Sequence, residues 1–238
     1  MNTRFLISTF FGAGVWLICS VAAANWDTGA CPQPYTGPAP CFETEINGNT
    51  YHFNGGGGHA HDWHGLPAAE GGGGFEFSRD NVDFACPSVS SSCNMNLSGE
   101  VKKCQDSTGA WRIGIRVGAL DLSPGDFLCN FVTMGGFPWY LKETSSVNHC
   151  PFEDDCDGFI PYEPGASAYT VSLGIVDLNA PFGPWIEGEH LHGVVFTSGR
   201  GATLDLSNKM FFDCDEQETG CSIDGILSLD NAKSLDIY

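Results

Sequence analysis

Short segments in which apolar and polar residues alternate recur along this chain, and turns rich in glycine separate them. The clearest is Trp111 to Val117, where the odd-numbered apolar residues share one face and Arg112, Gly114 and Arg116 take the other. Alternation with a period of two is the pattern of a β-strand with one buried face. Similar segments lie at 42–46, 49–53, 169–175, 190–196 and 223–229.

Turn signals recur roughly every ten residues, which is typical of all-β proteins. Asn47-Gly48 stands between two alternating segments and is the strongest short hairpin signal in the chain. No amphipathic helix of ten or more residues is evident after the N-terminal segment. We therefore expect an all-β fold over residues 25–238, an antiparallel sandwich or jelly-roll-like double sheet stapled by disulfides, with a barrel as the less favoured alternative.

The first 24 residues have the order of a secretory signal peptide. Arg4 supplies the positive charge, an apolar run extends from Phe5 to Cys19, and small residues at 21–24 precede an expected cleavage after Ala24. The apolar run is too short for a comfortable membrane span, and no later segment is long and apolar enough to form one. We expect a secreted protein that is periplasmic, extracellular or bound to the cell surface.

Eleven cysteines are present, and removing Cys19 with the signal peptide leaves ten. An even number in a secreted chain predicts a disulfide framework. Proximity suggests the pairs Cys31–Cys41, Cys86–Cys93, Cys150–Cys156 and Cys214–Cys221, with Cys104 and Cys129 joined by elimination, although sequence leaves the connectivity open. A thiolate metal site is the weaker alternative, because no Cys-x-x-Cys pair occurs.

Acidic residues greatly outnumber basic ones. The whole chain has 29 acidic and 10 basic residues and a formal net charge of −19. Such a charge repels nucleic acid and anionic lipid, so we expect no nucleic-acid partner. It favours a well-solvated protein and is compatible with metal cations or cationic partners.

A Gly/His-rich loop at 55–74 concentrates histidines between two runs of four glycines. His59, His61 and His64 could present imidazoles to Zn²⁺, Cu²⁺ or Ni²⁺. His190 and His192 repeat the one-residue gap in an expected strand, with Leu191 toward the core and both histidines toward solvent. A metal site assembled from both clusters is one hypothesis, and a polar loop plus two surface histidines is the other.

Two acidic loops are candidate sites for calcium. Asp154, Asp155 and Asp157 could form a loose Ca²⁺ site, although the segment lacks the ligand pattern of an EF-hand. The acids around Cys214 are better explained as a solvated turn.

The C-terminal two-thirds resembles the secreted bacterial PraA/PraB-type proteins, activators of alkane oxidation. The resemblance rests on Cys93-Asn-Met-Asn-Leu-Ser-Gly99, on Leu128-Cys129 followed by Phe137-Pro-Trp139, and on Cys221-Ser-Ile-Asp-Gly-Ile-Leu227. It implies an extracellular protein associated with the cell surface or a biofilm. It carries over no catalytic residue.

The sequence thus favours a non-enzymatic surface, matrix or adhesion-related protein that binds an extracellular ligand such as a polysaccharide or a cell surface. A metal-binding protein that uses the histidines of the Gly/His-rich loop is the alternative. A hydrolase of unknown substrate comes third, because the chain has no Gly-x-Ser-x-Gly nucleophile motif.

Overall fold

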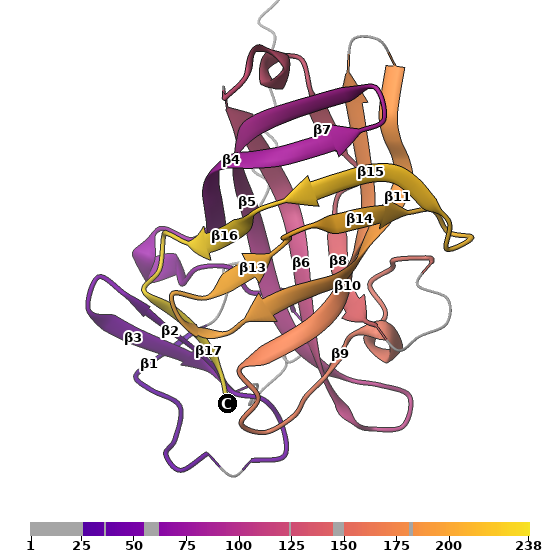
Figure 1. Cartoon of the computed structure of the whole chain (residues 1–238). Coiled ribbons are helices and arrows are strands. Elements are labelled where there is room, and N and C mark those ends of the chain that lie inside the picture. The colour runs from indigo at the N-terminus through magenta and orange to yellow at the C-terminus, as the bar shows by residue number, and fades with distance from the viewer. Residues whose placement is uncertain (1–25, 36, 55–61, 124, 145–149, 181–182) are drawn as a thin grey trace, which may run out of the picture.

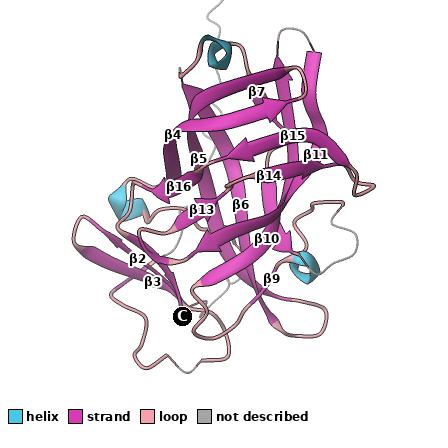
Figure 2. Ribbon diagram, in the orientation of Figure 1, coloured by secondary structure: helices cyan, strands magenta, loops and turns pink. Residues whose placement is uncertain are grey.

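The computed structural model describes residues 26–35, 37–54, 62–123, 125–144, 150–180 and 183–238. The expected signal peptide, together with His59 and His61 of the Gly/His-rich loop, lies outside the described residues. Nearly all the regular structure is strand (Figure 2).

Figure 1 shows how the elements are arranged in space. The strands are β1 Asp27–Thr28, β2 Phe42–Ile46, β3 Asn49–Phe53, β4 Phe75–Cys86, β5 Val89–Gln105, β6 Trp111–Ser123, β7 Thr133–Gly135, β8 Trp139–Glu143, β9 Ile160–Pro161, β10 Ala168–Ala180, β11 Gly183–Thr197, β12 Gly199–Arg200, β13 Thr203–Asp205, β14 Lys209–Phe212, β15 Glu218–Asp224, β16 Ile226–Leu229 and β17 Ser234–Ile237. Three short 3-10 helices are η1 Ala68–Glu70, η2 Phe127–Asn130 and η3 Cys156–Gly158.

The strands form a small sheet, ordered β1-β3-β2-β17-β12, and a large one. The large sheet runs β15-β14-β11-β13-β16-β4-β5-β6-β8-β10-β7, and every pairing in it is antiparallel. Additional pairings of β11 with β10 and of β15 with β4 close the path upon itself. Figure 1 shows β13, β14, β15 and β16 running across β5, β6 and β8, so the large sheet forms two facing layers. The prediction of an all-β, antiparallel, double-layered fold is confirmed.

Side chains from both layers fill the space between them. Leu97 of β5, Trp139 of β8, Leu191 of β11 and Phe211 of β14 line the same small space in the interior. All four are at most 2% exposed. Burying apolar surface at roughly 25 cal/mol per Å² is the main favourable contribution to such a fold. The alternating pattern of the sequence therefore specifies the inner face of each layer.

Local signals in the sequence form the turns that were expected of them. Asn47 and Gly48 adopt φ values of 51° and 82° between β2 and β3, as a two-residue hairpin requires. The predicted strand at 111–117 begins β6, with Ile113, Ile115 and Val117 buried.

Five disulfides staple the sheets, and four of them differ from the pairs expected by proximity. Cys31–Cys41 is confirmed. The other bridges are Cys86–Cys221, Cys93–Cys129, Cys104–Cys156 and Cys150–Cys214, with sequence separations of 36 to 135 residues. The proximity rule is wrong here because antiparallel pairing brings cysteines of distant strands together, as it does where β4 meets β15. Such a framework is consistent with an oxidising or extracellular compartment.

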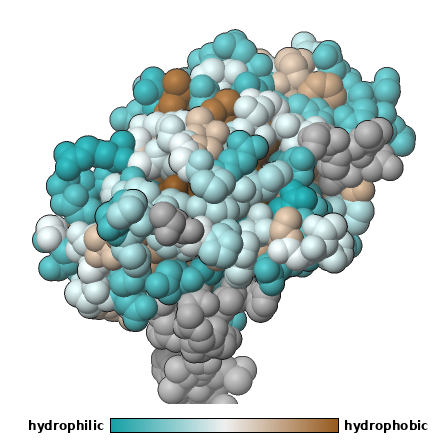
Figure 3. Space-filling view, turned by 90° about the horizontal axis from the view of Figure 1, so that it is seen from below, coloured by the Kyte–Doolittle hydropathy of each residue, from teal (hydrophilic) through white to brown (hydrophobic). Residues whose placement is uncertain are grey.

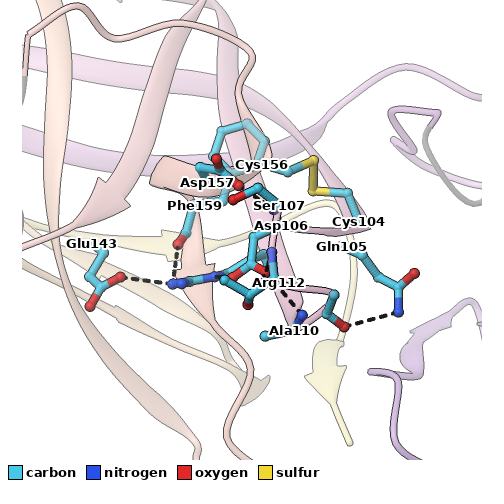
Figure 4. A network of polar contacts seen from close by, with 12 residues as sticks. Cys104, Gln105, Asp106, Ser107, Ala110, Arg112, Glu143, Cys156, Asp157 and Phe159 are labelled. Atoms are coloured by element: carbon cyan, nitrogen blue, oxygen red, sulfur yellow. Dashed lines mark hydrogen bonds and ion pairs between the residues drawn. A yellow bond between two sulfur atoms is a disulfide. The ribbon is translucent and has the colours of Figure 1, made fainter.

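The turn between β5 and β6 is organised by Asp106. Its Oδ1 accepts hydrogen bonds from the amides of Thr108 and Ala110, both at 2.9 Å, and its Oδ2 accepts one from Arg112 Nε at 2.8 Å (Figure 4). Hydrogen bonds from the Thr108 hydroxyl and from Arg112 hold the pKa of Asp106 far below its usual range. Arg112 also reaches Glu143 at 2.8 Å, which ties β6 to β8.

Lys103 of β5 is fully buried where the small sheet meets the large one. Its ammonium donates to the carbonyl of Pro40 at 3.0 Å and to that of Asn54. Burial lowers the pKa of Lys103 to about 8. These two bonds attach the segments on either side of the β2–β3 hairpin to the large sheet.

The surface is polar over the face shown in Figure 3, with only small separate hydrophobic spots. Among the described residues, no helix has the length and apolarity that crossing a membrane requires.

Candidate metal centre

Strand β11 carries the candidate site, and its pairing with β10 is interrupted on both sides of that site. The register shows one extra β11 residue within 187–188 and another within 192–193. Each bulge contains a glycine at positive φ, Gly188 at 72° and Gly193 at 65°. Bulges of this kind bend a strand and redirect its side chains, and they are common beside functional sites. These two bulges, together with an extra β10 residue at Ile175 that lies between them in the register, set the direction of the β11 side chains at the site.

His190 lies between these bulges and His192 is part of the second one; both are on the outer face of β11, while Leu191 points into the core at 2% exposure. The expected alternation is thus correct, but His190 does not face solvent. It is 0% exposed, because the ring of Phe152 covers it at a centroid distance of 5.4 Å and Phe212 lies at 6.2 Å. His192 keeps 26% of its side chain exposed.

Glycine at position 174 makes room for His190. Gly174 of β10 pairs with His190 across the sheet. A Cβ at this position would lie 2.8 Å from the Cβ of His190 and 3.1 Å from the Phe152 ring. A side chain at position 174 would therefore force His190 or the Phe152 ring to shift.

Glu216 completes the site from the turn between β14 and β15. Its backbone has a φ of 60°, a conformation that costs a non-glycine residue free energy and that is found preferentially at functional sites. The turn is fixed by Asp213, whose carbonyl accepts the Glu216 amide at 3.0 Å and whose Oδ1 accepts the Gln217 amide at 2.9 Å. This geometry directs the Glu216 carboxylate onto β11.

Three ligand atoms converge at this point. The Nε2 atoms of His190 and His192 are 3.0 Å apart, and the Glu216 carboxylate lies 2.7 Å from His192 Nε2 and 3.6 Å from His190 Nε2. All three ligand atoms lie within 4.8 Å of one another. A tetrahedral zinc ion with bonds of about 2.0–2.1 Å separates its ligand atoms by roughly 3.3 Å. The observed separations bracket that value.

A single cation suits this arrangement better than protons do. Each imidazole nitrogen offers either one proton or one lone pair, and His192 Nε2 has close contacts with both His190 and Glu216. One ion placed between the three atoms would accept a lone pair from each. Three protein ligands leave a fourth position open, as in catalytic and exchangeable zinc sites rather than closed structural ones.

An outer-shell partner orients His192. Ser172 Oγ, on a buried residue of β10, lies 3.0 Å from His192 Nδ1. A hydrogen bond on the nitrogen that faces away from the metal is the usual companion of a metal-ligating histidine. The net charge of −19 also raises the local concentration of cations.

Of the other predicted histidines, the structure describes only His64, which does not join this centre. His64 is 1% exposed and stacks on Phe53 at a centroid distance of 3.8 Å, while its backbone pairs with Val101. It is a core residue between β3 and β5, so the expected cluster of His64 with His190 and His192 is not formed. His59 and His61 lie outside the described residues.

Glu216 was missed by the sequence argument, which took the acids around Cys214 for a solvated turn. Among the described residues, His190, His192 and Glu216 form the one group of three potential ligands whose ligand atoms all lie within 4.8 Å of one another. The available signal was a short acidic loop flanked by two cysteines, and it does not specify which acid turns inward.

The acids considered for calcium are used elsewhere. Asp154 pairs with the ammonium of Lys102 and accepts the indole N–H of Trp63 at 2.9 Å. Asp155 accepts the amide of Asp157 at 3.1 Å, and Asp157 accepts the amide of Ser107. These carboxylates make four separate contacts, and the described residues offer no shared site for Ca²⁺ here.

Comparisons with known protein families, with curated proteins and with solved structures found no match to this chain. The interpretation of the site therefore rests on its geometry.

Proposed function

We propose that this protein binds one transition-metal ion, Zn²⁺ or Cu²⁺, through His190, His192 and Glu216. The observation that carries the proposal is the convergence of two imidazole nitrogens and a carboxylate oxygen within 4.8 Å. The two bulges of β11 and the positive φ of Glu216 support it, because each directs a ligand to this point.

The ligand types favour these ions over hard cations. Imidazole nitrogen suits zinc and copper, whereas Ca²⁺ and Mg²⁺ prefer oxygen ligands. The proposal modifies the sequence hypothesis, which used the histidines of the Gly/His-rich loop together with His190 and His192. It retains the expectation of a secreted protein, which the N-terminal segment and the disulfide framework support.

The test compares two double variants of the mature protein, purified without a metal column or a His-tag. Zn²⁺ affinity would be measured by competition with a chromophoric chelator. We expect one ion per chain, and a loss of affinity of more than about 100-fold in His190→Ala/His192→Ala, since removing an outer-shell partner alone costs about 10- to 100-fold. The matched control, His59→Ala/His61→Ala, should bind as the wild type does. Loss of binding in the control alone would contradict the proposal.

A second candidate is contact with an extracellular ligand such as a polysaccharide or a cell surface, the role that the resemblance to PraA/PraB-type proteins implies. Exposed aromatic residues favour it. Phe127 and Phe131 are 75% and 45% exposed, with ring centroids 4.9 Å apart. Their segment contains η2, drawn at the top of Figure 1, and Cys129 fixes it to β5 through Cys93.

This candidate predicts that Phe127→Ala/Phe131→Ala loses adsorption to insoluble polysaccharide or to cells, while His190→Ala/His192→Ala keeps it. Co-sedimentation measures both variants. Adsorption that survives loss of the two phenylalanines would exclude this surface.

A further inference from the structure

We infer that the Cys150–Cys214 disulfide is a redox switch for metal binding at His190, His192 and Glu216. The inference rests on the proposed function, because it concerns control of that same centre. It adds a co-reactant class, an external dithiol, and a condition under which the ion is released.

The disulfide joins the two segments that complete the centre. Cys214 lies two residues before Glu216, in the turn that delivers the carboxylate. Cys150 lies two residues before Phe152, whose ring covers His190. Cys214 Sγ is also 3.9 Å from the carbonyl of Gly188, in one of the bulges of β11. One covalent bond therefore joins the ligand turn to the hydrophobic cover, beside one of the bulges of β11.

This bridge is also the one most open to a reductant. Cys214 is exposed and Cys150 is half-buried. In each of the other four described bridges, one cysteine or both are at most 3% exposed. Both cysteines are this deeply buried in Cys31–Cys41 and in Cys93–Cys129. Thiol–disulfide exchange requires access of the attacking thiolate to a sulfur. A dithiol should therefore reduce Cys150–Cys214 first.

The chemistry balances with a dithiol as the reductant. Its first thiolate attacks one sulfur of the bridge and forms a mixed disulfide, releasing the other cysteine as a thiolate. Its second thiolate then displaces the remaining cysteine and closes the dithiol into a disulfide. Two electrons pass to the protein, and Cys150 and Cys214 take up two protons to become thiols. Zn²⁺ keeps its oxidation state throughout.

Reduction changes none of the three ligand residues, but it removes the disulfide that holds the Glu216 turn in position. The Glu216 turn then depends on the bonds to Asp213, and its positive φ costs free energy that the covalent tether no longer offsets. A ligand that must be ordered at the moment of binding lowers affinity. Loss of a supporting contact of this kind lowers metal affinity by about 10- to 100-fold.

The first experiment separates the tether from any thiol chemistry. Zn²⁺ affinity is measured for the oxidised wild type, for Cys150→Ser/Cys214→Ser and for the control Cys31→Ser/Cys41→Ser. We expect the Zn²⁺ affinity of Cys150→Ser/Cys214→Ser to be at least 10-fold lower than that of the wild type. The control should bind Zn²⁺ with wild-type affinity. Equal affinity in wild type and Cys150→Ser/Cys214→Ser overturns the switch but leaves the proposed function standing. An oxidised wild type that does not bind Zn²⁺ at all overturns the proposed function itself.

The second experiment uses the wild type and needs no variant to fold. The protein is titrated with tris(2-carboxyethyl)phosphine, which stands in for the dithiol, and free thiols are alkylated and mapped by mass spectrometry. We expect Cys150 and Cys214 to be labelled first and Zn²⁺ to be released in parallel. Earlier labelling of a buried pair, or Zn²⁺ binding that is unchanged or tighter after labelling, overturns the inference.

Discussion

At the scale of single residues, the proposed metal centre should depend on the charge of one carboxylate. Glu216 is the exposed member of the site, with a side chain 38% exposed, yet it lies 2.7 Å from His192. We expect its contribution to come from coordination, because its carboxylate faces the two imidazole nitrogens while much of its side chain is open to solvent.

We therefore predict that Glu216→Gln weakens Zn²⁺ binding by about 10-fold or more and leaves the unfolding midpoint of the metal-free protein unchanged. Glu218→Gln, on an exposed residue two positions further along, is the matched control and should change neither quantity. Chelator competition and denaturant unfolding measure the two effects. A metal-free Glu216→Gln that is clearly less stable would show that this residue is structural.

The three ligand residues also differ in how far the sequence could predict them. The one-residue gap between His190 and His192 was enough to predict that they share a face of a strand. Glu216 lies 24 residues from His192, and pairing among β11, β14 and β15 brings them together. Local patterns carry no information about that pairing, which is why the third ligand could not be predicted.

At the scale of elements, the disulfides act on loops of very different length. The Cys31–Cys41 loop spans 10 residues and the Cys86–Cys221 loop spans 135. In the chain-entropy description, these loops correspond to about 3 and about 5 kcal/mol of stabilisation. The bridge between β4 and β15 should therefore contribute more to the stability of the fold.

Replacing Cys86 and Cys221 with Ala should lower the free energy of unfolding by about 1 kcal/mol more than replacing Cys31 and Cys41, because the intact Cys93–Cys129 and Cys150–Cys214 bridges shorten the loop that Cys86–Cys221 closes. Denaturant unfolding of both double variants under oxidising conditions measures the difference. Equal losses would mean that packing around each bridge, rather than loop closure, sets its contribution.

The Asp106 turn makes the fold sensitive to acid. Its hydrogen bonds with Thr108 and Arg112 lower the pKa of Asp106 in the folded protein relative to the unfolded chain. The stability that this carboxylate supplies is therefore present above its usual pKa, and it is lost as pH falls toward the lowered folded value.

We predict that Asp106→Asn is less stable than the wild type at pH 7 and that the two approach each other as pH falls from 5 to 2. Unfolding midpoints of both proteins, measured at several pH values between 5 and 2, test whether the stability difference shrinks as pH falls. A constant gap between the two proteins across the whole range would show that the charge of Asp106 is not what stabilises the turn.

At the scale of the whole molecule, hydrophobic alternation was enough to predict the fold class, and it was not enough to predict how the large sheet closes. Alternation specifies which face of a strand is buried, whereas strand order depends on which edges meet. The pairing of β10 with β11 follows from their sequence adjacency, but that of β4 with β15 joins strands more than 130 residues apart. Four of the five disulfide pairs escaped prediction for the same reason.

The most direct measurement is a crystal structure of the oxidised protein soaked with Zn²⁺, with anomalous data collected at the zinc absorption edge. The account predicts one strong peak about 2 Å from His190 Nε2, from His192 Nε2 and from a Glu216 carboxylate oxygen. Its fourth position should hold water. Peaks confined to the Gly/His-rich loop, with none between these three residues, would contradict the claim that β11 and the Glu216 turn form the metal centre.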